Sequence, residues 1–169
     1  YRIMKESGWL CRTRPKKVPN LGKTYHVTDN KLDRDFQVDK PMEKLVTDIT
    51  YLYFGNCRLY LSSIMDLYNR EIVAYTISEC QDTDFVLDTL HQLELPQGAL
   101  LHSDQGSVYT SKAYYQACTE KGITRSMSRK GTPADNACIE WFHSVLKSET
   151  FYLHKWRNLT KDSITDIVK

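Results

Sequence analysis

Three runs of β-branched and aromatic residues stand close together in the first half of the chain. The first two cover residues 45–54 and 57–65, and Gly55-Asn56 between them is typical of a two-residue hairpin turn. The third run covers residues 72–78 and follows a short polar turn. The three runs predict an antiparallel meander.

Apolar residues recur at helical spacing further on, where helices alternate with short strands. We expect a helix from a cap at Asp82 or Thr83 to about Leu93, and another from a cap at Ser111 to Gly122. The remaining elements are strands at 99–102 and 123–127 and a helix at 135–149. The order βββ-α-β-α-β-α predicts an α/β fold, a mixed five-stranded sheet with helices on both faces.

The last helix has a polar stripe and an apolar side. At ~100° per residue, its polar residues fall within about 60° of one direction. They are Asn136, Glu140, His143, Ser144 and Lys147. The apolar side, expected to dock on the sheet, consists of Cys138, Ile139, Trp141, Phe142, Val145 and Leu146. Asp135 and Asn136 are expected to cap the helix.

Composition excludes several classes of protein. The chain has 169 residues with 41% hydrophobic and 26% charged residues, which is globular. No apolar run reaches the ~18 residues of a membrane span, and no signal peptide is visible. The five cysteines form no CxxC pair, so we expect a reduced intracellular protein without a zinc ribbon.

The net charge of +2 is the sum of unlike segments. Residues 1–40 carry +5, residues 41–149 carry −5 and residues 150–169 carry +2. A basic segment suits a polyanion, although it is also typical of a solvated linker. An acidic segment repels phosphates unless metal ions intervene.

Three carboxylates are candidates for that metal site. Asp48 lies within a strand, Asp104 ends the fourth strand before a glycine turn, and Glu140 lies on the polar stripe. Each has an ordinary alternative, namely an ion pair, a turn aspartate or a solvated helix face. The first and fourth strands would be neighbours, so the carboxylates can converge and suit Mg²⁺ or Mn²⁺.

The strings around these residues resemble a known family. They are Thr47-Asp48-Ile49-Thr50-Tyr51, His102-Ser103-Asp104-Gln105-Gly106-Ser107-Val108-Tyr109, Ser126-Met127-Ser128-Arg129-Lys130-Gly131 and Asp135-Asn136-Ala137-Cys138-Ile139-Glu140. With 35 residues between Asp104 and Glu140, the region 41–150 resembles the catalytic core of bacterial insertion-sequence transposases. These are retroviral-integrase-like Asp-Asp-Glu enzymes, and the likeness is greatest to the family made by fusing two reading frames.

The resemblance implies an RNase H-like fold and a divalent-metal-dependent polynucleotidyl transferase. Asp48, Asp104 and Glu140 would bind two Mg²⁺ or Mn²⁺ ions. The enzyme would cleave the DNA ends of the element, and a 3′-hydroxyl would then attack target DNA. Partners would be double-stranded DNA and at least a second copy of the chain, without a membrane, in the bacterial cytoplasm at the nucleoid.

Further residues are expected to contact DNA. Lys147 matches a family lysine near the scissile phosphate, and Ser128, Arg129 and Lys130 form a loop that could hold the backbone. Asn136 points to the side of Glu140 and is grouped with them. His102 and His143 are expected to be hydrogen-bonding neighbours, and Asp66 a turn residue rather than a fourth ligand.

The resemblance also predicts how the chain is divided. Residues 1–40 would be a basic arm or linker after a truncated helical DNA-binding region, and 41–150 the integrase-type catalytic core. Residues 151–169 would begin a truncated C-terminal helical segment. Two other functions stay open: a catalytically inactive or domesticated DNA-binding protein, and another RNase H-like nuclease.

Overall fold

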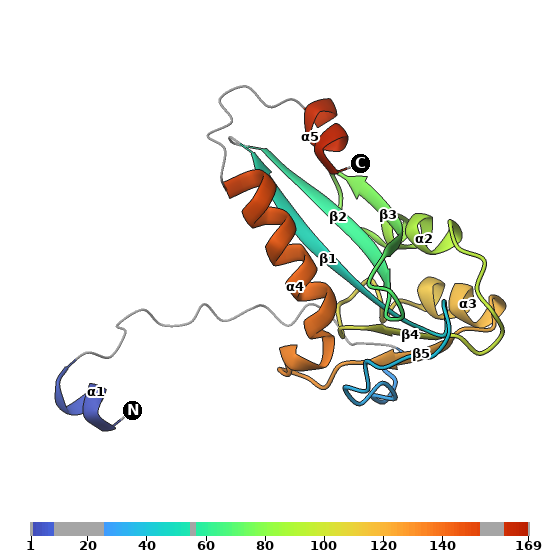
Figure 1. The fold of residues 1–169 in the computed structure, drawn as a ribbon, viewed down its shortest axis with the longest axis horizontal. Helices are drawn as coiled ribbons and strands as arrows, with labels where there is room; N and C mark the ends of the chain where they lie inside the picture. The colour runs from blue at the N-terminus through green and yellow to red at the C-terminus, as the bar shows by residue number, and fades with distance from the viewer. Residues whose placement is uncertain (1, 9–25, 55–56, 153–160, 169) are drawn as a thin grey trace.

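A five-stranded sheet forms the centre of the molecule (Figure 1). The computed structural model describes residues 2–8, 26–54, 57–152 and 161–168. The strands are β1 (Lys44–Phe54), β2 (Cys57–Asp66), β3 (Ile72–Ser78), β4 (Leu100–Ser103) and β5 (Thr124–Met127). Their order is β3-β2-β1-β4-β5, with β1, β2 and β3 antiparallel and β4 and β5 parallel to β1. The predicted mixed sheet is confirmed; the hairpin turn at Gly55-Asn56 lies outside the described residues.

The helices follow in the predicted order. They are α1 (Arg2–Glu6), α2 (Thr83–His91), α3 (Lys112–Glu120), α4 (Ala137–Leu146) and α5 (Lys161–Val168). Two predicted caps are confirmed, because Asp82 accepts a hydrogen bond from the amide of Phe85 and Ser111 accepts one from that of Tyr114. Gly122 follows α3 with a φ of +66°, which suits a residue without a side chain. No described helix has the length and apolar character to cross a membrane.

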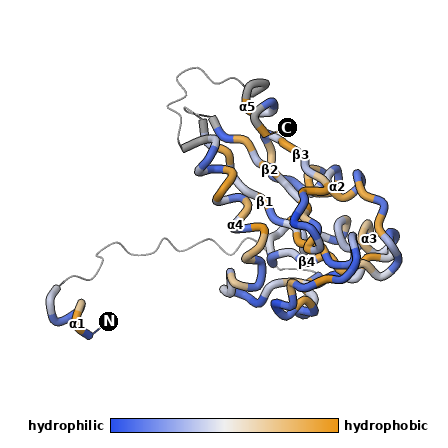
Figure 2. Tube along the Cα trace, viewed as in Figure 1, coloured by the Kyte–Doolittle hydropathy of each residue, from blue (hydrophilic) through white to orange (hydrophobic). Residues whose placement is uncertain are grey.

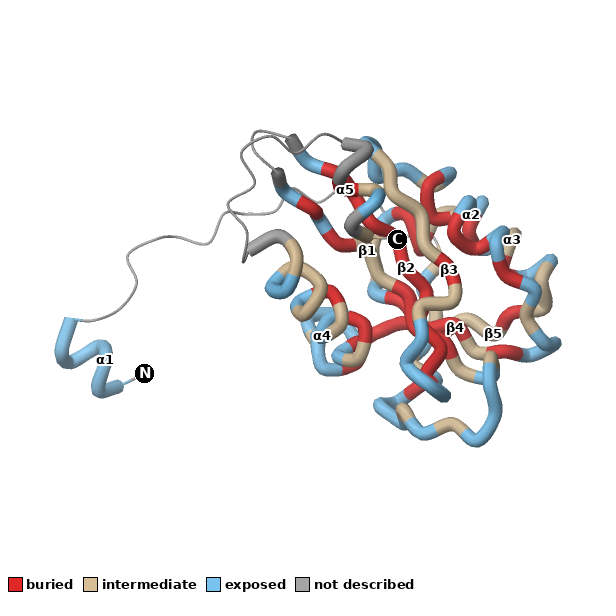
Figure 3. The backbone as a smooth tube through the Cα atoms, turned by 45° about the horizontal axis from the view of Figure 1, so that its top comes forward, coloured by how far each residue is buried: buried red, intermediate tan, exposed pale blue. Residues whose placement is uncertain are grey.

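The two faces of the sheet are covered by different helices. Successive residues of a strand point to opposite faces. Leu45 packs in the core that contains side chains of α2 and α3, whereas Val46 packs with Ile139 of α4. Figure 2 shows hydrophobic residues in orange along α2 and α4, and Figure 3 shows the buried middle of β1 and β2 in red. Asp48 shares the α4 face with Val46, so the candidate site lies between this helix and β1.

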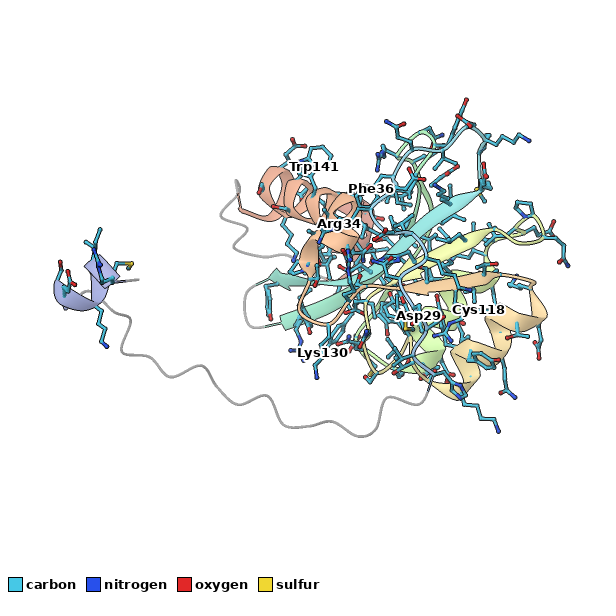
Figure 4. The ribbon with its side chains drawn as sticks, turned by 90° about the horizontal axis from the view of Figure 1, so that it is seen from below. Asp29, Arg34, Phe36, Cys118, Lys130 and Trp141 are labelled. Atoms are coloured by element: carbon cyan, nitrogen blue, oxygen red, sulfur yellow. The ribbon has the colours of Figure 1, made fainter. Side chains whose placement is uncertain are left out.

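The orientation, start and end of α4 differ from the prediction, because the helix ends at Leu146 and a π-helical segment (Lys147–Tyr152) follows it. Ile139 and His143 are its buried residues, while Trp141 is 69% exposed and lies on the outside of the helix (Figure 4). A 3₁₀ turn (Pro133–Asn136) precedes the helix; Asn136 occupies the N-cap position, but neither its side chain nor that of Asp135 makes a capping hydrogen bond. The helix is rotated because the polar His143 finds partners on the sheet, and periodicity alone treats such a residue as solvated.

The segment before β1 is part of the packed domain, although its polar composition predicted a linker. Leu32 is only 2% exposed and packs with Val46, Met65 and Ile139. The amides of Lys31 and Leu32 both donate to the Ser126 hydroxyl. Residues 26–40 therefore support the sheet, and the proposed division of the chain stays a prediction.

Candidate active site

Two carboxylates come together where β1 pairs with β4: Asp48 lies within β1, and Asp104 directly follows the end of β4. Val46 of β1 pairs with His102 of the parallel strand β4. Asp48 and Asp104 stand two residues further along each segment, on the same side as this pair, because side chains alternate with a period of two. The pairing of β1 with β4 thus brings together residues that are 56 positions apart.

Glu140 lines both of the cavities beside these strands. A cavity of about 440 Å³ is lined by Asp104, Glu140 and the 128–133 loop. A second cavity of about 330 Å³ is lined by Asp48, Glu140, Lys147 and neighbouring residues of β1 and α4. The three predicted carboxylates therefore border two cavities that have Glu140 in common.

The carboxylates are close enough to influence one another. Burial raises the pKa of Asp104. The hydrogen bond from the Gly106 amide opposes this change, and the charge of Asp48 adds to it. Partial burial and the charges of Asp48 and Asp104 raise the pKa of Glu140, while His143 opposes the change. Burial lowers the pKa of Lys147, against the attraction of Asp48. A cation bound among these groups would relieve this repulsion.

The donor set fits a hard divalent cation in its chemistry. Carboxylate oxygens are the ligands that Mg²⁺ and Mn²⁺ prefer. Among the described residues, no group of three or more His, Cys, Asp or Glu side chains is arranged so that it could hold a metal ion. Asp104 Oδ1 accepts a hydrogen bond of 2.8 Å from the Gly106 amide, which restricts the orientation of this carboxylate.

The two histidines near the site are hydrogen-bonding neighbours, as predicted. His102 is fully buried, and its ring nitrogens lie 2.8 Å from the Ser126 hydroxyl and 3.0 Å from the Ser128 hydroxyl. Burial lowers the pKa of His102 to about 4, so the ring is neutral at ordinary pH. His143 lies 2.7 Å from the Ser63 hydroxyl. Asp66 is likewise a turn residue that accepts bonds from the amides of Met42 and Tyr68.

An ion-pair network fixes the loop that lines the larger cavity. Asp135 has no exposed side-chain area, and its carboxylate binds both Arg34 and Arg129 at 2.8 Å. A further bond of 3.0 Å comes from the backbone amide of Arg129. Figure 4 shows Arg34 and Phe36 beside the start of α4. The segment before β1 therefore helps to shape the wall of the site.

Comparison with known families identifies the domain. A sequence profile described as the integrase core domain matches residues 38–133, which is more than half of the chain. The chain belongs to the integrase core domain family. The matched part of this integrase core contains Asp48 and Asp104 and ends before Glu140.

The integrase core is also similar to individual proteins. It is 40% identical over 154 residues to the InsK protein of insertion sequence element IS150 from Escherichia coli, covering 88% of the chain and 54% of InsK. It is 31% identical over 161 residues to the transposase for insertion sequence element IS629 from Shigella sonnei, covering 93% of the chain and 54% of that protein. The chain thus spans about half the length of these relatives.

A solved structure supports the predicted fold. The HTLV-2 integrase catalytic core domain, in complex with magnesium and in a trimeric form, matches with a TM-score of 0.59 at 16% identity. The likeness covers 76% of this chain and 83% of that one. The RNase H-like fold expected for the integrase core is confirmed.

The residues predicted to contact DNA lie in unlike surroundings. Arg129 and Lys130 are exposed at the mouth of the larger cavity, although Asp135 already binds the Arg129 guanidinium. Lys147 is partly buried beside Glu140. Ser128 is 7% exposed and bonded to His102. Asn136 is 2% exposed, lines the larger cavity and donates a hydrogen bond to the Thr47 carbonyl, which connects the start of α4 to β1.

Sequence reasoning missed three residues of this integrase core. The Ser63 hydroxyl contacts the His143 ring, and Arg34 forms an ion pair with Asp135 beside the 128–133 loop. Only the chain positions of these residues are visible in the sequence, and their partners are 80 and 101 residues away. The sequence offers one signal, an aspartate (Asp135) that follows Arg129 and Lys130, and such an aspartate before a helix also predicts a helix cap.

A methyl group at Gly106 should disturb Asp104 without unfolding the domain. An added Cβ would stand 2.9 Å from Asp104 Oδ1, so the carboxylate must leave the Gly106 amide. We expect Gly106→Ala to lower metal-dependent DNA cleavage about tenfold, the equivalent of one hydrogen bond to a charged group. Melting temperature and cleavage rate, measured with Ser107→Ala as control, check this; equal rates in both variants would contradict it.

Proposed function

We propose that this domain catalyses DNA transposition chemistry, by cleaving the DNA ends of an insertion sequence and joining them to target DNA. The observation that carries the proposal is that Asp48, Asp104 and Glu140, from three separate parts of the chain, line two cavities with Glu140 in common and lie close enough for their charges to interact. Membership of the integrase core family and likeness to insertion-sequence proteins support it. The magnesium complex of the HTLV-2 core supports the choice of metal.

The three carboxylates would hold two Mg²⁺ or Mn²⁺ ions. Such ions, when bound, supply activation of the attacking oxygen and stabilisation of the leaving oxygen. The role of the protein side chains is to hold and orient: β1 and β4 fix Asp48 and Asp104, and α4 presents Glu140 across from them. Metal charge would also allow a phosphodiester to approach an otherwise acidic surface.

The basic residues would hold the DNA backbone. Lys147 lies on the same cavity as Asp48 and Glu140, where its ammonium group can meet a phosphate near the cleaved bond. Arg129 and Lys130 edge the other cavity and can meet the flanking backbone. Ser128 and Asn136 would support the DNA-binding surface: Ser128 is hydrogen-bonded to His102, and Asn136 is hydrogen-bonded to the Thr47 carbonyl of β1.

The substrate class has consequences for assembly and location. The chain would act on double-stranded DNA as a dimer or larger assembly, because two DNA ends must be joined. The trimeric form of the HTLV-2 core supports self-association. We place the reaction in the bacterial cytoplasm, at the nucleoid.

Metal removal tests the proposal directly. The purified chain, or the longer transposase that contains it, is incubated with duplex DNA that carries the ends of the element. We expect nicked and joined products with Mg²⁺ or Mn²⁺ and none with excess EDTA, because the carboxylates cannot bind a phosphodiester unaided. Products are separated on denaturing gels. Equal activity in EDTA would overturn the mechanism, and DNA binding without products in any metal would favour the inactive alternative.

A further inference from the structure

His143 is a buried ring with one unsatisfied nitrogen. The residue is 3% exposed, and its Nε2 lies 2.7 Å from the Ser63 hydroxyl oxygen. Nδ1 has no hydrogen-bond partner among the described residues and lies 3.4 Å from Asp48 Oδ2. A buried polar atom without a hydrogen-bond partner destabilises the folded state. The position of Nδ1 beside Asp48 therefore indicates that His143 does more than fill space in the core.

The register of β1 and β2 explains how one ring reaches both partners. Asp48 and Ser63 are directly opposite each other in the antiparallel pair. Directly opposed residues share a face of the sheet, at a Cβ separation of about 5 Å. His143 on α4 stands over this pair, one helical turn after Glu140. The ring thus connects the helix that carries Glu140 with the strand that carries Asp48.

Electrostatics selects the tautomer of the ring. A neutral imidazole has one N–H donor and one acceptor nitrogen. The nearby carboxylate favours the proton on Nδ1, because a lone pair there would face negative charge. Nε2 is then the acceptor, and the Ser63 hydroxyl can donate to it. Ser63, His143 and Asp48 would form a chain of hydrogen bonds that ends on the carboxylate.

We propose that His143 is a positioning residue for Asp48. With its proton on Nδ1, 3.4 Å from Asp48 Oδ2, the ring would attract this carboxylate oxygen and restrict its rotation. The inference rests on the proposed function, in which Asp48 is a metal ligand. Groups that hydrogen-bond to metal ligands orient them, and losing such a group typically weakens metal binding 10- to 100-fold.

Two substitutions separate the contacts of the ring. In His143→Asn the side-chain nitrogen can occupy the position of Nδ1, so the contact to Asp48 is kept and the bond to Ser63 is lost. In His143→Gln the side-chain nitrogen can occupy the position of Nε2, so the contact to Ser63 is kept and the contact to Asp48 is lost. Both variants remove a buried ring, and thermal unfolding measures the structural cost that they share. His91→Gln, at the exposed end of α2, is the control for the same chemical change.

Binding of Mn²⁺ alone, followed by the electron paramagnetic resonance signal of the free ion, is the first readout. We expect His143→Gln to weaken binding about tenfold or more, and His143→Asn to stay within about threefold of the unchanged chain and of His91→Gln. Equal losses in both variants, or a larger loss in His143→Asn, would overturn the positioning role. Absence of Mn²⁺ binding in the unchanged chain would instead count against the proposed function.

The second readout needs neither metal nor a substituted ring. Nitrogen-15 chemical shifts of labelled histidine distinguish a proton on Nδ1 from one on Nε2. We expect His143 in the unchanged chain to carry its proton on Nδ1, and to lose this preference in Asp48→Ala. A proton on Nε2 in the unchanged chain would overturn the inference, whatever the outcome for metal binding.

Discussion

Replacing Glu140 by Gln should lower DNA cleavage and joining by at least about 10³-fold, because a metal ligand supplies several kcal/mol of transition-state stabilisation. The fold should not suffer. Partial burial of the carboxyl group and the charges of Asp48 and Asp104 raise the pKa of Glu140, which means that its ionised form is destabilised in the folded chain. Removing that charge should leave the melting temperature unchanged or slightly higher. Product formation per enzyme and thermal unfolding together check the result.

A glutamate outside the site serves as the control for the loss of one negative charge. Glu120 ends α3 and is exposed, so Glu120→Gln makes the same change outside the site. We expect that variant to be fully active, and Asp104→Asn to fail in the same way as Glu140→Gln. Full activity in Glu140→Gln or Asp104→Asn would rule out the proposed ligand set.

The second large effect concerns stability rather than chemistry. Asp135→Asn should lower the free energy of unfolding by about 3 kcal/mol, since breaking a buried ion pair costs 3–5 kcal/mol and the two arginines, about half exposed, can regain water. The amide would also turn a donor toward the guanidinium groups. Urea unfolding measures the change. Asp33→Asn is the control, because Asp33 is 77% exposed and 3.6 Å from Arg129; a similar small change in both variants would contradict the expectation.

The same ion pair predicts a dependence on pH. The hydrogen bonds from Arg129 hold the pKa of Asp135 far below its ordinary value of 3.8. A lowered pKa in the folded state means that the stabilisation is complete above about pH 4 and is lost as the pH falls toward the folded pKa. The difference in unfolding free energy between the unchanged chain and Asp135→Asn should therefore be constant near neutral pH and shrink in acid.

Local patterns in the sequence were sufficient for most of the sheet and its helices. The caps at Asp82 and Ser111 and the end of α3 at Gly122 depend on residues within a few positions of one another. β3 begins and ends where its β-branched run does. The three carboxylates were found because their surrounding strings resemble a family, and their roles stay a prediction.

What the sequence could not show depends on distant partners. His143 counted as part of a solvated stripe because Ser63, 80 residues away, is invisible to helical periodicity. Trp141 was expected inside because it is apolar, yet the rotation that buries His143 turns it outward. Asp135 was expected to cap a helix, since its partner Arg34 lies 101 residues earlier.

Lys31, Leu32 and Arg34 are bonded to Ser126 and Asp135, about 100 residues later in the chain, and these contacts bear on where the packed domain begins. A fragment beginning at Pro41 would keep all five strands and all three carboxylates. It would lose the two amides that bind the Ser126 hydroxyl and one of the two arginines that neutralise Asp135. The packed domain therefore begins at or before Lys31, ahead of residue 38, where the match to the family begins.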